Sequence, residues 1–342
     1  MSSNIKILLI YTGGTIGMQK DFETGALKAF NFSKLLQRVP ELKLLDCAIE
    51  TISFENPIDS SNISPESWVA IAEVIEQNYA AFDGFVVLHG SDTMSYSASA
   101  LSFMLENLGK PVIFTGSQLP IGDLRTDAKE NLITAIQIAS LQENGKPLVS
   151  EVGLYFEYKL YRGNRTTKIS AEHFNAFTSP NYPFLIESGV HLKVNSDLLL
   201  PLPQNKVLKI HKSFDNNVMI VKMFPGINQK ILETLMAVPG LKGVVLETFG
   251  SGNAPTENWF VQLLKNAIEA GIHIVNVTQC SGGSVDMGKY ETSSQLKQIG
   301  VISGKDCTTE AAITKLMFLL GQPISKENFK NQFEKSIRGE MG

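Results

Sequence analysis

The sequence predicts an α/β protein with two domains, a larger N-terminal one and a smaller C-terminal one, each built on a largely parallel sheet. Short apolar runs that are typical of buried strands alternate with segments of helical periodicity. Strands that alternate with helices form parallel sheets. The alternation pauses at a proline-containing stretch near residue 200 and then restarts. We therefore predict domains at residues 1–200 and 218–342, joined by a linker at 201–217.

The composition excludes several classes of function. With 342 residues, of which 43% are apolar, the chain can fill two cores. A net charge of −4, with acids and bases interspersed, offers no surface for nucleic acid or an anionic membrane. The N-terminal apolar run is too short for a signal peptide, and no later run could span a bilayer. Three scattered cysteines fit a reducing compartment, so we expect a soluble cytoplasmic protein.

In the first domain, strands are predicted at residues 5–11, 51–54, 85–88, 111–114 and 152–156. The helix after the second of these begins at Pro65, with Ser64 as its N-cap. Another helix has apolar positions from Met94 to Leu108, and a third covers residues 131–141. The polar residues 19–30 are expected to form a mobile loop over the end of the first strand.

The second domain repeats this pattern. Strands are predicted at residues 218–224, 244–249 and 272–277, with a helix at 255–270. Small hydroxyl, amide or glycine residues follow five strands of the chain in all. Ligands in open α/β sheets bind beyond the carboxyl ends of the strands, so these strand ends are the candidate binding positions.

The turn after the first strand carries the most informative residues. The strand runs directly into Thr12-Gly13-Gly14-Thr15, and glycine there allows a sharp turn and the close approach of a ligand. The glycine spacing fits neither a P-loop nor a dinucleotide-binding fingerprint, which disfavours phosphate binding. Thr15 is therefore a candidate nucleophile. A tight turn capped by a threonine explains the same residues without any activity.

Two further groups of polar residues have both a functional and a structural explanation. Ser91, Asp92 and Thr93 are all favoured helix N-caps, but a helix start also holds a substrate carboxylate. Because Asp59 and Asp92 are available to hold an ammonium group, an amino acid is the favoured ligand. Lys168 lies in a cation-rich stretch that fits a solvated surface. Beside Asp92 it would instead work in a hydroxyl–lysine–aspartate relay.

Metal and serine-hydrolase chemistry are disfavoured. The five histidines form no H-E-x-x-H motif, and the cysteines form no C-x-x-C motif. The sequence contains no G-x-S-x-G elbow. We assign His89 a structural role rather than that of a base, and we expect neither a metal site nor a cofactor.

Five motifs of the chain are most informative when they are considered in combination: YTGGTIGM (11–18), LHGSDT (88–93), TGSQ (115–118), YRGNRTTK (161–168) and GSGNAP (250–255). In this combination the chain resembles the bacterial asparaginase family, and most closely its cytoplasmic type I branch. The resemblance covers nearly the whole chain. It implies an active site at the carboxyl ends of the N-terminal strands. It also implies hydrolysis of L-asparagine to L-aspartate and ammonia through a threonine nucleophile and an aspartyl-ester intermediate, without a cofactor.

The resemblance assigns roles to individual residues. Thr15 matches the nucleophile, and a second catalytic group is matched by Ser91, Asp92 and Lys168. The positions that hold the α-ammonium, the α-carboxylate and the side-chain amide of the substrate match Asp59, Ser60, Ser61, Ser91, Asp92 and Ser117. Asn253 matches a residue that the neighbouring subunit supplies, so the resemblance implies a homotetramer built as a dimer of dimers.

Two positions near the catalytic group depart from the family pattern. The family usually has threonine where this chain has Ser91, and serine lacks the methyl group that restricts the hydroxyl rotamer. We therefore expect retained activity with a less rigidly placed hydroxyl. Many relatives place a tyrosine in the loop after the first strand, whereas this chain has Gly25-Ala26-Leu27. Tyr290, which matches a tyrosine in the C-terminal domain of some type I relatives, is expected to close over Thr15 instead.

An allosteric asparagine site of some type I relatives is only partly matched. Thr167 and Cys280 match two of its positions, but Glu247 stands where those relatives have an arginine. A carboxylate there would repel the carboxylate of asparagine. We therefore expect a hyperbolic rather than a sigmoidal dependence of rate on asparagine concentration.

Two other functions remain open from the sequence alone. An amidase that acts on glutamine, or on another amidated substrate such as a tRNA or peptide, would use the same strand ends. An amino-acid-binding sensor without catalytic activity would keep the same pocket. Ammonia release from asparagine and glutamine distinguishes these alternatives.

Overall fold

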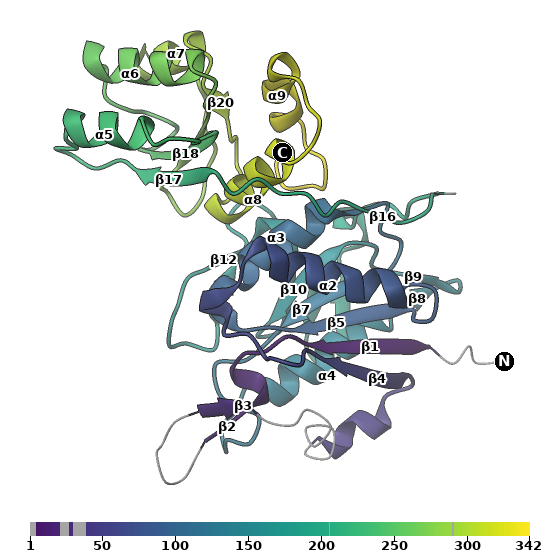
Figure 1. Ribbon diagram of the computed structural model, residues 1–342. Coiled ribbons are helices and arrows are strands. Elements are labelled where there is room, and N and C mark those ends of the chain that lie inside the picture. The colour runs from purple at the N-terminus through teal and green to yellow at the C-terminus, as the bar shows by residue number, and fades with distance from the viewer. Residues whose placement is uncertain (1–4, 21–26, 30–38, 205, 289–290) are drawn as a thin grey trace. The chain divides into compact units, whose positions relative to one another are not determined.

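The computed structural model describes residues 5–20, 27–29, 39–204, 206–288 and 291–342 (Figure 1). The chain divides into two compact units, Met1–Lys212 and Ser213–Gly342. Each unit combines a parallel or largely parallel sheet with helices. The predicted two-domain α/β fold is therefore confirmed.

The first unit is built on an eight-stranded sheet with the order β15-β14-β11-β10-β7-β5-β1-β4. Its strands from β10 to β4 are parallel, and β11, β14 and β15 extend it with antiparallel pairs. The strand bounds are β1 Lys6–Tyr11, β4 Ala48–Ser53, β5 Gly84–Leu88, β7 Val112–Thr115, β10 Val152–Phe156, β11 Lys159–Arg162, β14 Ile186–Ser188 and β15 Leu192–Val194.

Helices cover both faces of this sheet. Helix α4 (Ala128–Ala139) lies on one face, and α2 (Pro65–Asn78) and α3 (Met94–Met104) lie on the other (Figure 1). Alternate residues of β1, such as Ile7 and Leu9, share one buried cluster with Leu132 and Ile136 of α4. The intervening Leu8 is equally buried. A strand that is apolar on both faces needs helices on both, which explains its continuous apolar run.

The register of the central strands brings their carboxyl ends to one edge. Tyr11, the last residue of β1, pairs with Ser53 at the end of β4 and with Leu88 at the end of β5. Leu88 in turn pairs with Thr115 at the end of β7. The segments that follow these four strands therefore start side by side, although they are spread over about 100 residues of the sequence.

Two predicted segments contain strands that were not predicted from the sequence. The helix that begins at Met94 ends at Met104 rather than Leu108, because β6 (Leu105–Glu106) is extended and pairs with β16 (Lys209–Ile210). Leu105 is buried in this pairing, so the apolar periodicity continues past the helix end. At the edges of the expected loop 19–30, β2 (Met18–Lys20) pairs with β3 (Leu27–Ala29), and residues 21–26 lie outside the described ones.

Four more short strands form pairs of their own, namely β8 (Gln142–Glu143) with β9 (Lys146–Pro147) and β12 (Thr167–Lys168) with β13 (Phe177–Thr178). The second unit has a four-stranded parallel sheet with the order β17-β18-β19-β20. Its elements are β17 Val218–Lys222, α5 Gln229–Met236, β18 Gly243–Thr248, α6 Asn258–Glu269, β19 His273–Thr278, α7 Glu291–Gln298, β20 Ile302–Ser303, α8 Thr309–Leu320 and α9 Lys326–Phe333.

Candidate active site

The turn after β1 is shaped by close contacts of its backbone. Thr12 is buried, and its amide and hydroxyl both donate to the Leu88 carbonyl, at 3.1 and 2.9 Å. Gly13 and Gly14 have φ angles of 139° and 89°. A Cβ on Gly14 would lie 2.5 Å from the backbone nitrogen of Gly90, so only glycine fits this approach. Thr15 follows at the start of a 3₁₀ turn and is half-buried.

The loops after β4 and β5 meet beside this turn. The Asp59 carboxylate accepts the amide of Ser61 at 2.9 Å, which opens a 3₁₀ turn at residues 60–62. The buried Ser60 lies against Gly90, since a Cβ on Gly90 would be 2.5 Å from its Oγ. The Thr93 hydroxyl donates to the Ser60 carbonyl at 2.7 Å. The predicted substrate-binding residues of the two loops are thus brought together.

Lys168 connects the end of β5 with the hairpin of β12 and β13. Its ammonium donates to Ser91 Oγ at 2.9 Å and to Asp92 Oδ1 at 2.6 Å. The Lys168 side chain is 16% exposed and that of Asp92 is 64% exposed, so Asp92 faces solvent whereas Lys168 is largely covered. The structure therefore brings the three residues of the predicted hydroxyl–lysine–aspartate group into one hydrogen-bonded cluster.

The loop after β7 lies on the other side of Ser91. The Ser91 hydroxyl donates to Gln118 Oε1 at 3.1 Å, and Gln118 Nε2 donates to the His173 carbonyl at 3.1 Å. The neighbouring Ser117 is buried, and its hydroxyl donates to the Leu119 carbonyl at 2.6 Å. This hydrogen bond fixes Ser117 within the loop.

Sequence reasoning missed the residues that hold this loop in place. Asp127 Oδ2 accepts the amide of Gln118 at 2.9 Å, and Asp127 Oδ1 accepts the amide of Leu119 at 3.1 Å. Asn131 Nδ2 donates to the Gly116 carbonyl at 3.0 Å. Burial raises the pKa of Asp127 above its usual value. In the sequence, Asp127 stands directly before an apolar helix. That position indicates an N-cap, and it gives no sign that the carboxylate holds the preceding loop.

His89 stands behind the site in a buried chain of hydrogen bonds. Its Nδ1–H donates to the Gly90 carbonyl at 2.7 Å, so in the neutral ring Nε2 accepts the Ser97 hydroxyl at 2.9 Å. Trp68 Nε1 donates to the same hydroxyl at 3.0 Å. Burial lowers the pKa of His89 to about 4. A neutral ring with both nitrogens engaged fits the structural role predicted for His89.

From the lowered pKa of His89 we predict how the stability of the fold changes at acidic pH. Since His89 is neutral when folded but takes up a proton near pH 6.5 when unfolded, its contribution is present above pH 6.5 and is lost as the pH falls towards 4. Between pH 7 and 4.5 the loss amounts to about 2 kcal/mol. His89→Gln should therefore show a flatter fall in the free energy of unfolding, measured in urea, than the wild type. Equal pH slopes for the wild type and His89→Gln would contradict this prediction. An equally flattened slope in His191→Gln, an exposed control, would contradict it as well.

The remaining predicted residues belong to β12 or to the second unit. Tyr290 falls outside the described residues. Thr167 is the neighbour of Lys168 on β12. In the second unit, Glu247 on β18 accepts the Thr309 hydroxyl at 2.6 Å, and Cys280 is exposed just after β19. Asn253 is half-buried in the turn after β18, where its amide donates to the Phe249 carbonyl at 2.8 Å.

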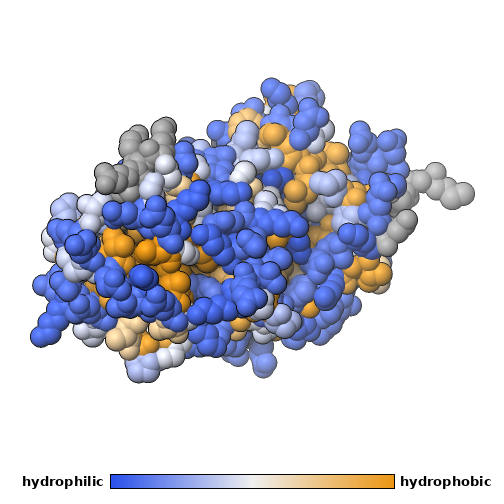
Figure 2. Space-filling model, turned by 90° about the horizontal axis from the view of Figure 1, so that it is seen from above, coloured by the Kyte–Doolittle hydropathy of each residue, from blue (hydrophilic) through white to orange (hydrophobic). Residues whose placement is uncertain are grey.

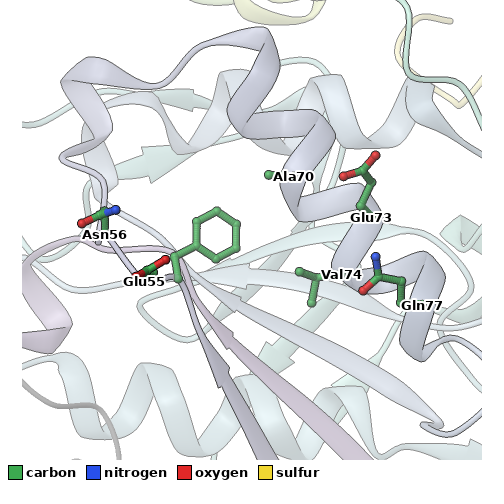
Figure 3. A pocket seen from close by; sticks show the side chains of 7 residues that line it. Glu55, Asn56, Ala70, Glu73, Val74 and Gln77 are labelled. Atoms are coloured by element: carbon green, nitrogen blue, oxygen red, sulfur yellow. The ribbon is translucent and has the colours of Figure 1, made fainter.

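A separate cavity lies beside α2. It has a volume of about 440 Å³ and is lined by Phe54, Glu55, Asn56, Ala70, Glu73, Val74 and Gln77. Figure 3 shows Glu73, Val74 and Gln77 on the helix facing the loop that carries Glu55 and Asn56. None of the predicted site residues lines it. Within the described parts of the chain, no group of three or more His, Cys, Asp and Glu side chains could hold a metal ion.

Two family profiles cover both units. "Asparaginase, N-terminal" matches residues 6–200, and "Glutaminase/Asparaginase C-terminal domain" matches residues 217–333. L-asparaginase 1 of Escherichia coli (strain K12) is 42% identical over 336 residues, which are 98% of this chain and 97% of that protein.

Solved structures agree with these matches. L-asparaginase I from Vibrio cholerae has a TM-score of 0.91 at 40% identity and covers 99% of this chain and 100% of its own. The thermostable L-asparaginase from Thermococcus kodakarensis has a TM-score of 0.89 at 33% identity, with 99% of each chain covered. The sequence and the fold agree, and the chain belongs to the asparaginase family.

Proposed function

We propose that this protein hydrolyses the side-chain amide of L-asparagine and releases L-aspartate and ammonia. The observation that carries this proposal is the cluster of Ser91, Asp92 and Lys168 at the end of β5. It lies at the strand end that packs, through Gly90, against the turn carrying Thr15. A nucleophile needs a neighbouring group that manages protons, and this cluster supplies one.

In the proposed reaction, Thr15 Oγ attacks the carbon of the side-chain amide. Backbone N–H groups at the strand ends stabilise the negative oxygen of the tetrahedral intermediate. The C–N bond then breaks, the amine leaves as ammonia with a transferred proton, and Thr15 carries an aspartyl ester. Water hydrolyses this ester and restores the hydroxyl. The cluster of Ser91, Asp92 and Lys168 helps to move the protons in these steps.

The substrate is held by groups from three loops. Asp59 and Asp92 provide carboxylates for the α-ammonium group, and both side chains are exposed to an incoming ligand. Ser60 and Ser61, together with the backbone N–H of Ser91, provide donors for the α-carboxylate. The backbone carbonyl of Ser117 accepts the N–H of the side-chain amide. In the proposed reaction, side chains and backbone groups of the protein act together with water alone, so the reaction requires no cofactor.

We also propose a homo-oligomer, a dimer of dimers, in which Asn253 reaches the site of a neighbouring subunit. Exposed apolar residues on the second unit support an interface there: Ile220, Phe224, Ile231, Leu235 and Val238. Figure 2 shows apolar residues gathered in patches among hydrophilic ones on one face.

We also propose a cytoplasmic location. The three free cysteines support a reducing compartment. No described helix has the length and apolar character needed to cross a membrane.

The rate of ammonia release at increasing asparagine concentration tests this proposal. We expect a hyperbolic curve, because Glu247 keeps a carboxylate at the position proposed for the second asparagine site. Lys222 Nζ lies 3.9 Å from its Oε2 and is 67% exposed, which leaves this charge only weakly compensated. A sigmoidal curve would contradict the expectation for Glu247. Asparagine binding without ammonia release would indicate a sensor, and faster release from glutamine would indicate a different amidase.

A further inference from the structure

We propose that Gln118 is a positioning residue that fixes the rotamer of the Ser91 hydroxyl in the catalytic cluster. This inference rests on the proposed function of that cluster. Gln118 comes from the loop after β7, whereas Ser91 follows β5. Its side-chain amide spans the gap between Ser91 and the carbonyl of His173.

The direction of each hydrogen bond follows from the groups involved. A lysine ammonium can only donate, so Ser91 Oγ accepts from Lys168 at 2.9 Å. A backbone carbonyl can only accept, so the nitrogen of the Gln118 amide faces His173 and its oxygen faces Ser91. The hydroxyl proton of Ser91 therefore points to Gln118 Oε1 at 3.1 Å. Lysine and glutamine together fix the hydroxyl from two sides.

The backbone of Gln118 is itself held firmly. Its amide donates to both carboxylate oxygens of Asp127, at 2.9 and 3.2 Å. Asp127 is 5% exposed, and Asn131, one turn further along α4, holds the carbonyl of Gly116. On the other side, the Ser170 hydroxyl accepts the amide of His173 at 2.9 Å. Because the Gln118 backbone and the partner of its Nε2 are both held in place, the side chain presents Oε1 to the Ser91 hydroxyl in a fixed position.

Serine needs such an anchor more than threonine does. Serine has three accessible χ1 rotamers, whereas the branched side chain of threonine is restricted by its methyl group. Ser91 is half-buried beside the exposed Asp92, so packing alone holds it weakly. The Gln118 amide thus supplies by hydrogen bonding the restriction that a methyl group would supply by steric contact.

A double-mutant cycle tests this inference through kcat and KM for asparagine. Gln118→Met keeps the length of the side chain but removes its acceptor and donor. We expect it to lower kcat about tenfold, the effect of one lost hydrogen bond, with KM changed less than about threefold. In the Ser91→Thr background the same replacement should lower kcat less than about threefold, because the methyl group already restricts the rotamer.

Several outcomes would overturn the inference. An equal loss in both backgrounds would indicate a general structural role for Gln118, and no loss in either would remove the role altogether. Gln137→Ala, an exposed glutamine of α4, is the matched control and should match the wild type. If Gln118→Met does not fold, Gln118→Glu retains an acceptor for Ser91 and should keep kcat closer to wild type than Gln118→Ala. A wild-type protein that releases no ammonia would instead refute the proposed function itself.

Discussion

Replacing Thr15 by alanine is expected to lower kcat for ammonia release from asparagine by a factor on the order of 10³ or more. Thr15 begins the 3₁₀ turn that follows β1, and the proposed reaction has no other group to form the ester. The fold should be unaffected, because Thr15 is half-buried and follows a turn held by Thr12 and Gly13. Steady-state ammonia assays and thermal unfolding measure the two effects separately.

The matched control is Thr15→Ser, which retains a hydroxyl at the same position. It should keep a measurable part of the activity that Thr15→Ala loses. Asparagine should still bind to Thr15→Ala, since the groups proposed to hold the substrate lie on other loops. Equal rates for wild type and Thr15→Ala would exclude Thr15 as the nucleophile.

Lys168→Met is expected to produce the second largest loss, a decrease in kcat on the order of 10²–10⁴-fold. Methionine retains the length of the side chain but removes the donor to Ser91 and the charge beside Asp92. Stability should change by less than about 1 kcal/mol, because the Asp92 side chain is 64% exposed and water can replace its partner. The ratio of kcat loss to stability loss therefore separates a catalytic from a structural role.

Two further variants sharpen this experiment. Lys168→Arg keeps the charge but presents a planar group, so it should not restore full kcat if the geometry of the donor matters. Lys193→Met replaces an exposed lysine of β15 and should leave kcat at the wild-type value. A kcat for Lys168→Met within a factor of about three of wild type would contradict the proposed relay.

The parallel core of the first unit could be predicted from the sequence because its signals are local. The apolar run at residues 5–11 and the cap at Ser64-Pro65 correspond to β1 and to the start of α2. The end of α3 could not be predicted in this way. Leu105 is buried whether it continues a helix or forms a strand, and its pairing with Ile210 depends on residues 105 positions away.

The antiparallel extension of the sheet was missed for a related reason. Strands β14 and β15 have three residues each, which is too short for a clear alternation of apolar and polar positions. The turn before β11 has positive φ angles at Glu157 and Tyr158, residue types that give no turn signal in a sequence. Tertiary contacts, and not local preference, decide these segments.

In the candidate site, too, some residues could be predicted from local sequence signals, whereas others depend on contacts between distant segments. The glycines after β1 and the polar residues after β5 carry chemistry that a sequence displays, and the structure brings Ser91, Asp92 and Lys168 together. Gln118 lay within a recognised motif, but its contact with Ser91 requires knowledge of how two loops approach each other. Asp127 resembled an ordinary helix cap, although its carboxylate faces the preceding loop.

The most direct test of the proposed mechanism is detection of the covalent intermediate. Wild-type protein mixed with asparagine, quenched in acid within one turnover and digested, should yield the peptide that contains Thr15 with the added mass of an aspartyl group. Lys168→Met should accumulate more of this adduct if the cluster also activates the hydrolytic water. An adduct on another residue, or full ammonia release with no adduct at any time, would contradict the assignment of Thr15 as nucleophile.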